Sequence, residues 1–284
     1  MPFVTLKELM EQAEAGKYAV GAFNCNNMEI IQAIITAAEQ ERSPVIVQAS
    51  QGAIKYAGLS YIVAMTRVAA EEAGVPVCLH LDHGTSFAQV MQCIRQGFSS
   101  VMIDGSKLPL EENIRLTNRV LEVARAVGVS VEAELGKIGG TEDDISVSDW
   151  EASLTDPEEA KYFVEQTGVD ALAVAIGTAH GRYKGVPKLD FARLEKIRAL
   201  TQVPIVLHGS SGVPDEAIRQ AVALGVRKIN IDTNIREAFV KGVKEVIAKN
   251  PDEIDPRKIL GPAKEEMIAI IREKIRLFGS SGQA

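Results

Sequence analysis

The sequence contains little cysteine, histidine or tryptophan. Among its 284 residues there are three cysteines, four histidines and one tryptophan. Cys25, Cys78 and Cys93 are odd in number and lack Cys-x-x-Cys spacing, so we interpret them as free thiols that pack in the interior. Free thiols are typical of a reducing compartment, and we therefore expect a cytoplasmic protein.

The chain also lacks long hydrophobic runs and an excess of positive charge. No run of about 18 apolar residues is present, so the sequence predicts no membrane span. Residues 1–16 are typical of a capped helix, with Thr5 and Glu8 as a capping box, and not of a signal peptide. With 31 basic and 38 acidic residues the net charge is −7, which argues against nucleic acid as a partner. A small phosphorylated substrate stays compatible, because it needs only backbone amides and a few cations.

Short apolar runs alternate with helical patterns along the chain. The predicted strands lie at 18–23, 44–50, 75–82, 100–104, 129–135, 171–176, 204–207 and 227–231. Eight strands alternating with helices over about 250 residues predict an α/β protein of the (β/α)8 TIM-barrel class, with 1–284 as one catalytic domain. An N-terminal helix and two C-terminal helices, 234–249 and 262–277, would be additions to the barrel, and we expect the small polar tail 279–284 to fray.

An open doubly wound sheet is the competing architecture. Such a sheet gathers its functional residues at one switch point, whereas here polar side chains end every predicted strand. This distribution favours the barrel, in which all strand ends meet at one face.

Three of the four histidines end apolar runs, and a glycine follows each. His83, His180 and His208 are these residues, while His80 lies inside its strand and is interpreted as an interior or supporting side chain. Three imidazoles with an open fourth position form the ligand set of a catalytic zinc. Asp82, beside His83, is a candidate for moving a proton next to that metal.

Two carboxylates end neighbouring strands. Asp104 and Glu134 are candidates for a second divalent cation or an alternative position of the first; the alternative is interior ion pairing or a solvated rim. Glu132, on the same face as Glu134, is a lesser candidate. Two loops suggest phosphate binding, 209–212 after the seventh strand and 230–233 before a helix, with Gly181 as a further amide.

Seven motifs in a fixed order carry a family resemblance: LHLDHG, SVMIDGS, SVEAELG, GGTEDD, AIGTAHG, VLHGSSG and KINIDT. The chain resembles the class II (zinc-dependent) fructose-1,6-bisphosphate aldolases and the related tagatose-bisphosphate aldolases. The resemblance implies a TIM barrel and a carbon–carbon lyase (an aldehyde-lyase), in which one zinc ion per chain stabilises the enediolate formed when the C3–C4 bond of the ketose breaks. Whether a monovalent cation is also needed stays open.

The resemblance also implies roles for single residues. His83, His180 and His208 would hold zinc, Asp104 and Glu134 match second-metal positions, and Asp82 would exchange the proton of the C4 hydroxyl. Glu142 would move the C1 proton of dihydroxyacetone phosphate, and Arg257 would reach the other phosphate across a dimer interface. The remaining substrate contacts would be Asn24, Ser50, Gly181, Gly209, Ser210, Ser211, Asn230, Ile231, Asp232 and Thr233.

The expected reaction is therefore reversible cleavage of fructose 1,6-bisphosphate to dihydroxyacetone phosphate and glyceraldehyde 3-phosphate, in glycolysis and gluconeogenesis. Tagatose 1,6-bisphosphate is the alternative substrate; Asp232 favours fructose, because we associate the tagatose enzymes with alanine at that position. No Schiff-base lysine is required, so Lys228, inside a strand, is expected to be structural. We expect a homodimer or homotetramer.

A zinc hydrolase is a weaker alternative because the first strand offers Asn24 and no histidine pair, and a metal-free partner subunit would not need all three histidines.

Overall fold

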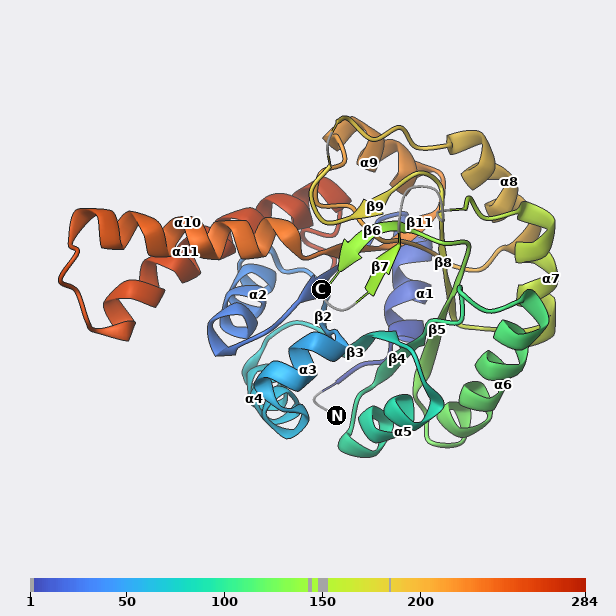
Figure 1. The fold of residues 1–284 in the computed structure, drawn as a ribbon, viewed down its shortest axis with the longest axis horizontal. Coiled ribbons are helices and arrows are strands. Elements are labelled where there is room, and N and C mark those ends of the chain that lie inside the picture. The colour runs from blue at the N-terminus through green and yellow to red at the C-terminus, as the bar shows by residue number, and fades with distance from the viewer. Residues whose placement is uncertain (1–2, 143–144, 148–152, 184) are drawn as a thin grey trace.

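The computed structural model describes residues 3–142, 145–147, 153–183 and 185–284, and for 141–142 and 145–147 it describes the backbone alone. Within this part of the chain, eight parallel strands form a closed barrel in the order β1-β11-β10-β8-β5-β4-β3-β2 (Figure 1). These strands are β1 (Val20–Asn24), β2 (Val45–Ala49), β3 (Val77–Gly84), β4 (Ser100–Ile103), β5 (Ser130–Leu135), β8 (Ala171–Val174), β10 (Ile205–Leu207) and β11 (Val226–Ile231). Each falls on a predicted strand, and closure confirms the barrel over the open sheet.

Helices surround the barrel, and the first of them closes the end at which the strands begin. They are α1 (Leu6–Gly16), α2 (Met28–Glu41), α3 (Gln51–Ala57), α4 (Leu59–Glu72), α5 (Phe87–Gln96), α6 (Leu110–Ala126), α7 (Pro157–Thr167), α8 (Phe191–Thr201), α9 (Asp215–Ala223), α10 (Thr233–Lys249) and α11 (Pro256–Phe278). The predicted capping box of Thr5 and Glu8 is present at α1. No helix in the described ranges is long and apolar enough to span a bilayer.

The core has two layers, one on each side of the barrel wall. Outward-facing strand residues pack against α2 to α11, while the inward-facing lower residues, including Ile46 and Met102, pack on Leu6, Leu9 and Met10 of α1. Because α1 fills the amino-terminal end of the barrel, the polar strand ends face the opposite, open end. Cys25, Cys78 and Cys93 are free and buried, as predicted.

Two sequence predictions about elements were wrong. The segment after β5 does not run as a loop: β6 (Gly139–Glu142) pairs with β7 (Ile145–Val147) and with β9 (Ala179–His180) in a small separate sheet. The last helix begins at Pro256, not at Pro262, because Asp255 caps it and a proline fits its first turn. Pro262 therefore lies inside α11.

The helices α10 and α11 extend together away from the barrel (Figure 1). The turn that joins them, 250–255, lies at the outer end of this hairpin. The chain end returns to α2, where the amides of Gly282 and Ala284 donate to the carbonyls of Glu41 and Arg42. The tail is thus anchored to the end of α2, and the expectation that it would fray was wrong.

Candidate active site

Three histidines from distant parts of the chain meet at the open end of the barrel. His83 ends β3, His208 follows β10 and His180 lies on β9. His208 Nδ1 lies 3.0 Å from His83 Nε2, and the His180 ring centroid lies 5.1 Å from that of His83 and 5.8 Å from that of His208. One nitrogen of each ring falls within 4.8 Å of the others, and all three side chains are buried. The predicted cluster therefore forms.

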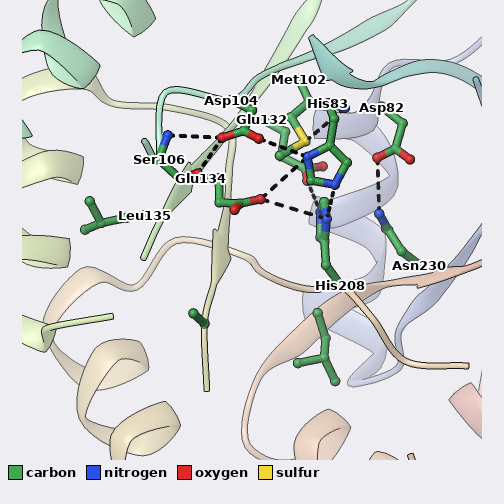
Figure 2. A network of polar contacts seen from close by, with 12 residues as sticks. Asp82, His83, Met102, Asp104, Ser106, Glu132, Glu134, Leu135, His208 and Asn230 are labelled. Carbon is green, nitrogen blue, oxygen red and sulfur yellow. Dashed lines mark hydrogen bonds and ion pairs between the residues drawn. The ribbon is translucent and has the colours of Figure 1, made fainter. Parts of the chain in front are cut away.

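The surroundings of two rings indicate where a cation fits. The outer nitrogens face carboxylates: His83 Nδ1 lies 3.1 Å from Asp104 Oδ2 and His208 Nε2 lies 2.9 Å from Glu132 Oε1 (Figure 2). Protons on those outer nitrogens would leave the lone pairs of His83 Nε2 and His208 Nδ1 directed at each other. A metal ion between the rings satisfies both lone pairs, so the residues fit a histidine-bound divalent cation.

Asp104 and Glu134 lie together beside His83. Glu134 Oε2 is buried, lies 3.8 Å from His83 Nδ1 and 4.0 Å from His208 Nδ1, and accepts no hydrogen bond from the described residues. Burial and the adjacent Asp104 charge raise the pKa of Glu134. The pKa of Asp104 is lowered despite its burial, because His83 and Ser106 hydrogen-bond to it. Both carboxylates are within reach of the histidine cluster, as a second or alternative metal position requires.

Asp82 is fully buried next to His83 and is surrounded by side-chain amides. Asn24 Nδ2 donates to its Oδ2 at 2.8 Å, Gln48 Nε2 approaches the same oxygen at 3.3 Å, and Asn230 Nδ2 donates to Oδ1 at 3.3 Å. These donors come from β2, β1 and β11, the three successive strands on one side of β3 in the barrel. The carboxylate is thereby fixed in position.

Gln48 was not among the predicted site residues. Its Nε2 also donates to Asn24 Oδ1 at 2.6 Å, so it orients the amide that holds Asp82. The available signal was a glutamine inside an otherwise apolar run, two positions before Ser50 and so on the same face of the strand.

The backbone at His83 is unusual. His83 has φ +48°, a left-handed conformation that non-glycine residues rarely adopt. Gly84 follows in close contact with β4, since a Cβ there would lie 2.5 Å from the Met102 carbonyl oxygen. This turn at the end of β3 aims His83 toward the cluster while Asp82 points to the other side.

The predicted phosphate loops lie next to the histidines. Gly209, directly after His208, has φ +63°, and a Cβ on it would lie 2.5 Å from the Ala179 carbonyl oxygen. The Tyr183 hydroxyl accepts from the Ala179 amide and donates to the Gly209 carbonyl, both at 2.7 Å. Tyr183, which the sequence did not indicate, therefore ties the His180 loop to the His208 loop.

The other predicted residues fall into three groups. Ser210 follows Gly209, Ser211 Oγ accepts from the Asp232 amide at 3.4 Å, and Asp232 and Thr233 begin α10, where helix amides favour an anion. Ser50 caps α3 and is buried near Asn24 and Gln48, the ends of neighbouring strands. Ile231 packs its side chain in the outer core, so only its backbone could contact a ligand.

The last two predicted residues lie on β6 and in the first turn of α11. Glu142 lies on β6, and its side chain falls outside the described part of the structure. Arg257 begins α11 at the outer end of the hairpin (Figure 1), where its side chain is 90% exposed and pairs with Asp255 at 2.8 Å.

Comparison with known proteins agrees with this geometry. A family profile described as fructose-bisphosphate aldolase class-II matches residues 4–283. A fructose-bisphosphate aldolase of Geobacillus stearothermophilus is 50% identical, covering 100% of this chain and 99% of that one, and one of Thermus caldophilus is 48% identical, covering 99% of both. The crystal structure of the YdjI aldolase from Escherichia coli K12 superposes with a TM-score of 0.88 at 35% identity, covering 99% of each chain.

Proposed function

Since the chain belongs to the class II fructose-bisphosphate aldolase family, we propose that it cleaves fructose 1,6-bisphosphate reversibly to dihydroxyacetone phosphate and glyceraldehyde 3-phosphate. It is a lyase of the aldolase type. The similar curated relatives carry the name of the fructose enzyme, which supports fructose over tagatose. The observation that carries the proposal is the fixed Asp82 carboxylate directly beside a buried three-histidine cluster.

The metal would be held by His83, His180 and His208, and we propose zinc because three imidazoles with an open position suit it. Bound there, it would supply a Lewis acid for the ketose oxygens and stabilise the negative charge that develops on the triose fragment. Asp104 and Glu134 would orient His83 and offer oxygen ligands for a second divalent ion.

The chain's own acid–base work falls to Asp82. In cleavage its carboxylate takes the proton of the C4 hydroxyl, and in condensation it returns that proton. The amides of Asn24, Gln48 and Asn230 orient the carboxylate without competing for the proton, because an amide does not titrate near neutral pH. Glu142, at the end of β6, is proposed to move the C1 proton of the triose phosphate.

The phosphate of the triose is proposed to bind between Gly181, Gly209 to Ser211 and the amino terminus of α10. Backbone amides and a helix start are the groups that recognise phosphate in barrel enzymes. Asp232 carries a carboxylate that pairs with Arg236 at 2.8 Å. We propose that this side chain and Asn24 contact the sugar near C4, where fructose and tagatose differ.

The test is the cleavage of fructose 1,6-bisphosphate before and after complete chelation with EDTA, followed by coupled reduction of the triose phosphates. We expect activity to disappear with EDTA and to return with Zn²⁺, and tagatose 1,6-bisphosphate to react more slowly. Activity that survives complete chelation would contradict the metal-dependent mechanism. Measured zinc of about one ion per chain is expected for a three-histidine site.

The cellular setting follows from this activity. We propose that the protein works in glycolysis and gluconeogenesis in the cytoplasm, as a homodimer or homotetramer.

A further inference from the structure

Lys228 contacts one residue that holds His208 and another that holds Asp82, although the proposed mechanism assigns it no role. It lies on β11 and is fully buried inside the barrel. Its Nζ lies 3.0 Å from Glu132 Oε2 and donates to Asn230 Oδ1 at 2.7 Å. Glu132 in turn contacts His208, and Asn230 contacts Asp82. We propose that Lys228 is a positioning residue that orients the metal ligand His208 and the proton-transfer group Asp82 together; this inference rests on the proposed function.

The contact of Lys228 with Asn230, here called the Asn230 arm, sets the direction of the Asn230 amide. An ammonium group can only donate hydrogen bonds, so Asn230 must turn Oδ1 toward Lys228. The Nδ2 group is then left to donate to Asp82 Oδ1. Without the ammonium the amide can rotate and present its oxygen to the carboxylate. That rotation would repel Asp82 from its position.

The contact of Lys228 with Glu132, here called the His208 arm, sets the orientation of the His208 ring. Lys228 and the His80 ring contact Glu132 Oε2, His80 at 3.4 Å, which leaves Glu132 Oε1 for His208 Nε2. The proton of His208 is thereby placed on Nε2, and Nδ1 points into the histidine cluster. A carboxylate behind a metal-bound histidine fixes its tautomer and raises its affinity for the metal.

The neighbouring Arg227 provides a matched control. It is also buried, but it faces the opposite side of β11 and donates to Glu14 of α1 at 3.0 Å and to the carbonyls of Val222 and Val226. Because these partners belong to α1 and to the α9–β11 turn, Arg227 serves the fold and not the site. Replacing Lys228 therefore tests the positioning of site residues, and replacing Arg227 on the same strand tests the stability of the fold alone.

The experiment compares Lys228→Met with Arg227→Met in three measurements: zinc affinity by competition with a chelator, kcat and KM with fructose 1,6-bisphosphate at saturating zinc, and thermal midpoint. For Lys228→Met we expect zinc affinity and kcat each to fall about 10–100-fold, the range for groups that support metal ligands, with kcat changing more than KM. Arg227→Met should lower only the thermal midpoint. A folded Lys228→Met protein with the zinc affinity and kcat of the unmodified protein would overturn the proposal.

If Lys228→Met does not fold, the double variant Lys228→Met/Glu132→Gln removes both charges together. The amide oxygen of the introduced glutamine can still accept from His208, so zinc affinity should stay closer to that of the unmodified protein than kcat does, because the Asn230 arm remains broken. Recovery of kcat to the unmodified level would overturn the proposal. An unmodified protein that does not cleave the bisphosphate would contradict the proposed function alone, since the zinc measurement still tests the His208 arm.

Discussion

Among the described residues the carboxylate of Asp82 is held by amide donors, and this makes its role separable from that of the histidines. Asp82→Asn preserves the size of the side chain but cannot accept a proton. We expect kcat to fall roughly 10²–10⁴-fold, the contribution typical of a positioned general acid–base group. Zinc content should not change, because Asp82 is not part of the histidine cluster.

The measurement for Asp82→Asn is kcat beside metal analysis of the same sample. His180→Ala is the matched variant, which should lose zinc and activity together. Near-full turnover in Asp82→Asn would assign the C4 proton to another group. Loss of zinc in Asp82→Asn would show that Asp82 supports the metal and not the proton transfer.

At the residue scale, the sequence predicted groups whose chemistry is visible in isolation. The histidines stand out because the chain has four, and Asp82 because it ends a strand beside one of them. The roles of Gln48, Tyr183, Glu132 and Lys228 depend on which strands and loops the closed barrel brings together. Lys228 and Glu132 come from strands separated by β10 and β8 and meet only across the barrel interior. Sequence spacing contains no such information.

At the scale of elements, the end of β3 depends on a close approach to β4. A methyl group at Gly84 would collide with the Met102 carbonyl, which cannot move without disturbing the strand pair. We expect Gly84→Ala to lower the free energy of unfolding by about 1–3 kcal/mol, as overpacking does, and to weaken zinc binding because His83 shifts. Gly74→Ala is the control, since a methyl group there would have nothing within 4 Å; denaturant midpoints with and without zinc measure both effects. Equal stability of the two variants would contradict this account.

The contact of α2 with α11 depends on one buried carboxylate. Glu41 accepts from Arg272 and Arg276, each at 2.7 Å, and from Ser281 at 2.9 Å. The Arg276 hydrogen bond, against the effect of burial and with help from Arg272, lowers the pKa of Glu41 to about 2. We expect Glu41→Gln to cost about 1.5–3 kcal/mol of unfolding free energy at pH 7, the range for hydrogen bonds to a charged group.

The pH dependence of this contact has a definite sign. A pKa lowered in the folded state stabilises the protein above the ordinary glutamate value of 4.5, and this stabilisation is lost as the pH falls toward about 2. The difference between Glu41→Gln and the unmodified protein should therefore be constant from pH 7 to 5 and shrink below pH 4.5. Denaturant unfolding of the metal-free proteins measures it without pH-dependent release of zinc. A constant difference down to pH 2 would contradict the role of the Glu41 charge.

Elements whose position follows from local hydrophobic periodicity were predictable. Elements that depend on a contact between distant segments were not. All eight barrel strands follow from apolar runs. The β6–β9 pairing joins segments about 40 residues apart through the contact of Gly140 with the His180 backbone, and the tail 279–284 is ordered by Glu41 on α2. Pro262 was misleading because a proline ordinarily breaks or kinks a helix interior, whereas α11 continues through it.

For the whole molecule, the projecting hairpin raises the question of what Arg257 does. Arg257 lies in the first turn of α11, and α11 begins at the outer end of the hairpin that projects away from the barrel (Figure 1). Contact with substrate therefore requires a second copy of the chain. If Arg257 of one subunit reached the partner's substrate in a symmetric dimer, the two-fold axis would place the partner's Arg257 in the first subunit's site as well.

This arrangement predicts complementation between two defective chains. Arg257→Ala alone should raise KM for fructose 1,6-bisphosphate, and Asp82→Asn alone should lower kcat by roughly 10²–10⁴-fold. When both are co-expressed, a mixed dimer contains one site with an intact Asp82 and the partner's intact arginine, so random pairing restores high-affinity activity at about a quarter of all sites. Co-expression that restores nothing, or a fully active monomer by light scattering, would show that Arg257 does not act between subunits, because a site built within one chain cannot be repaired by a partner that carries the other defect.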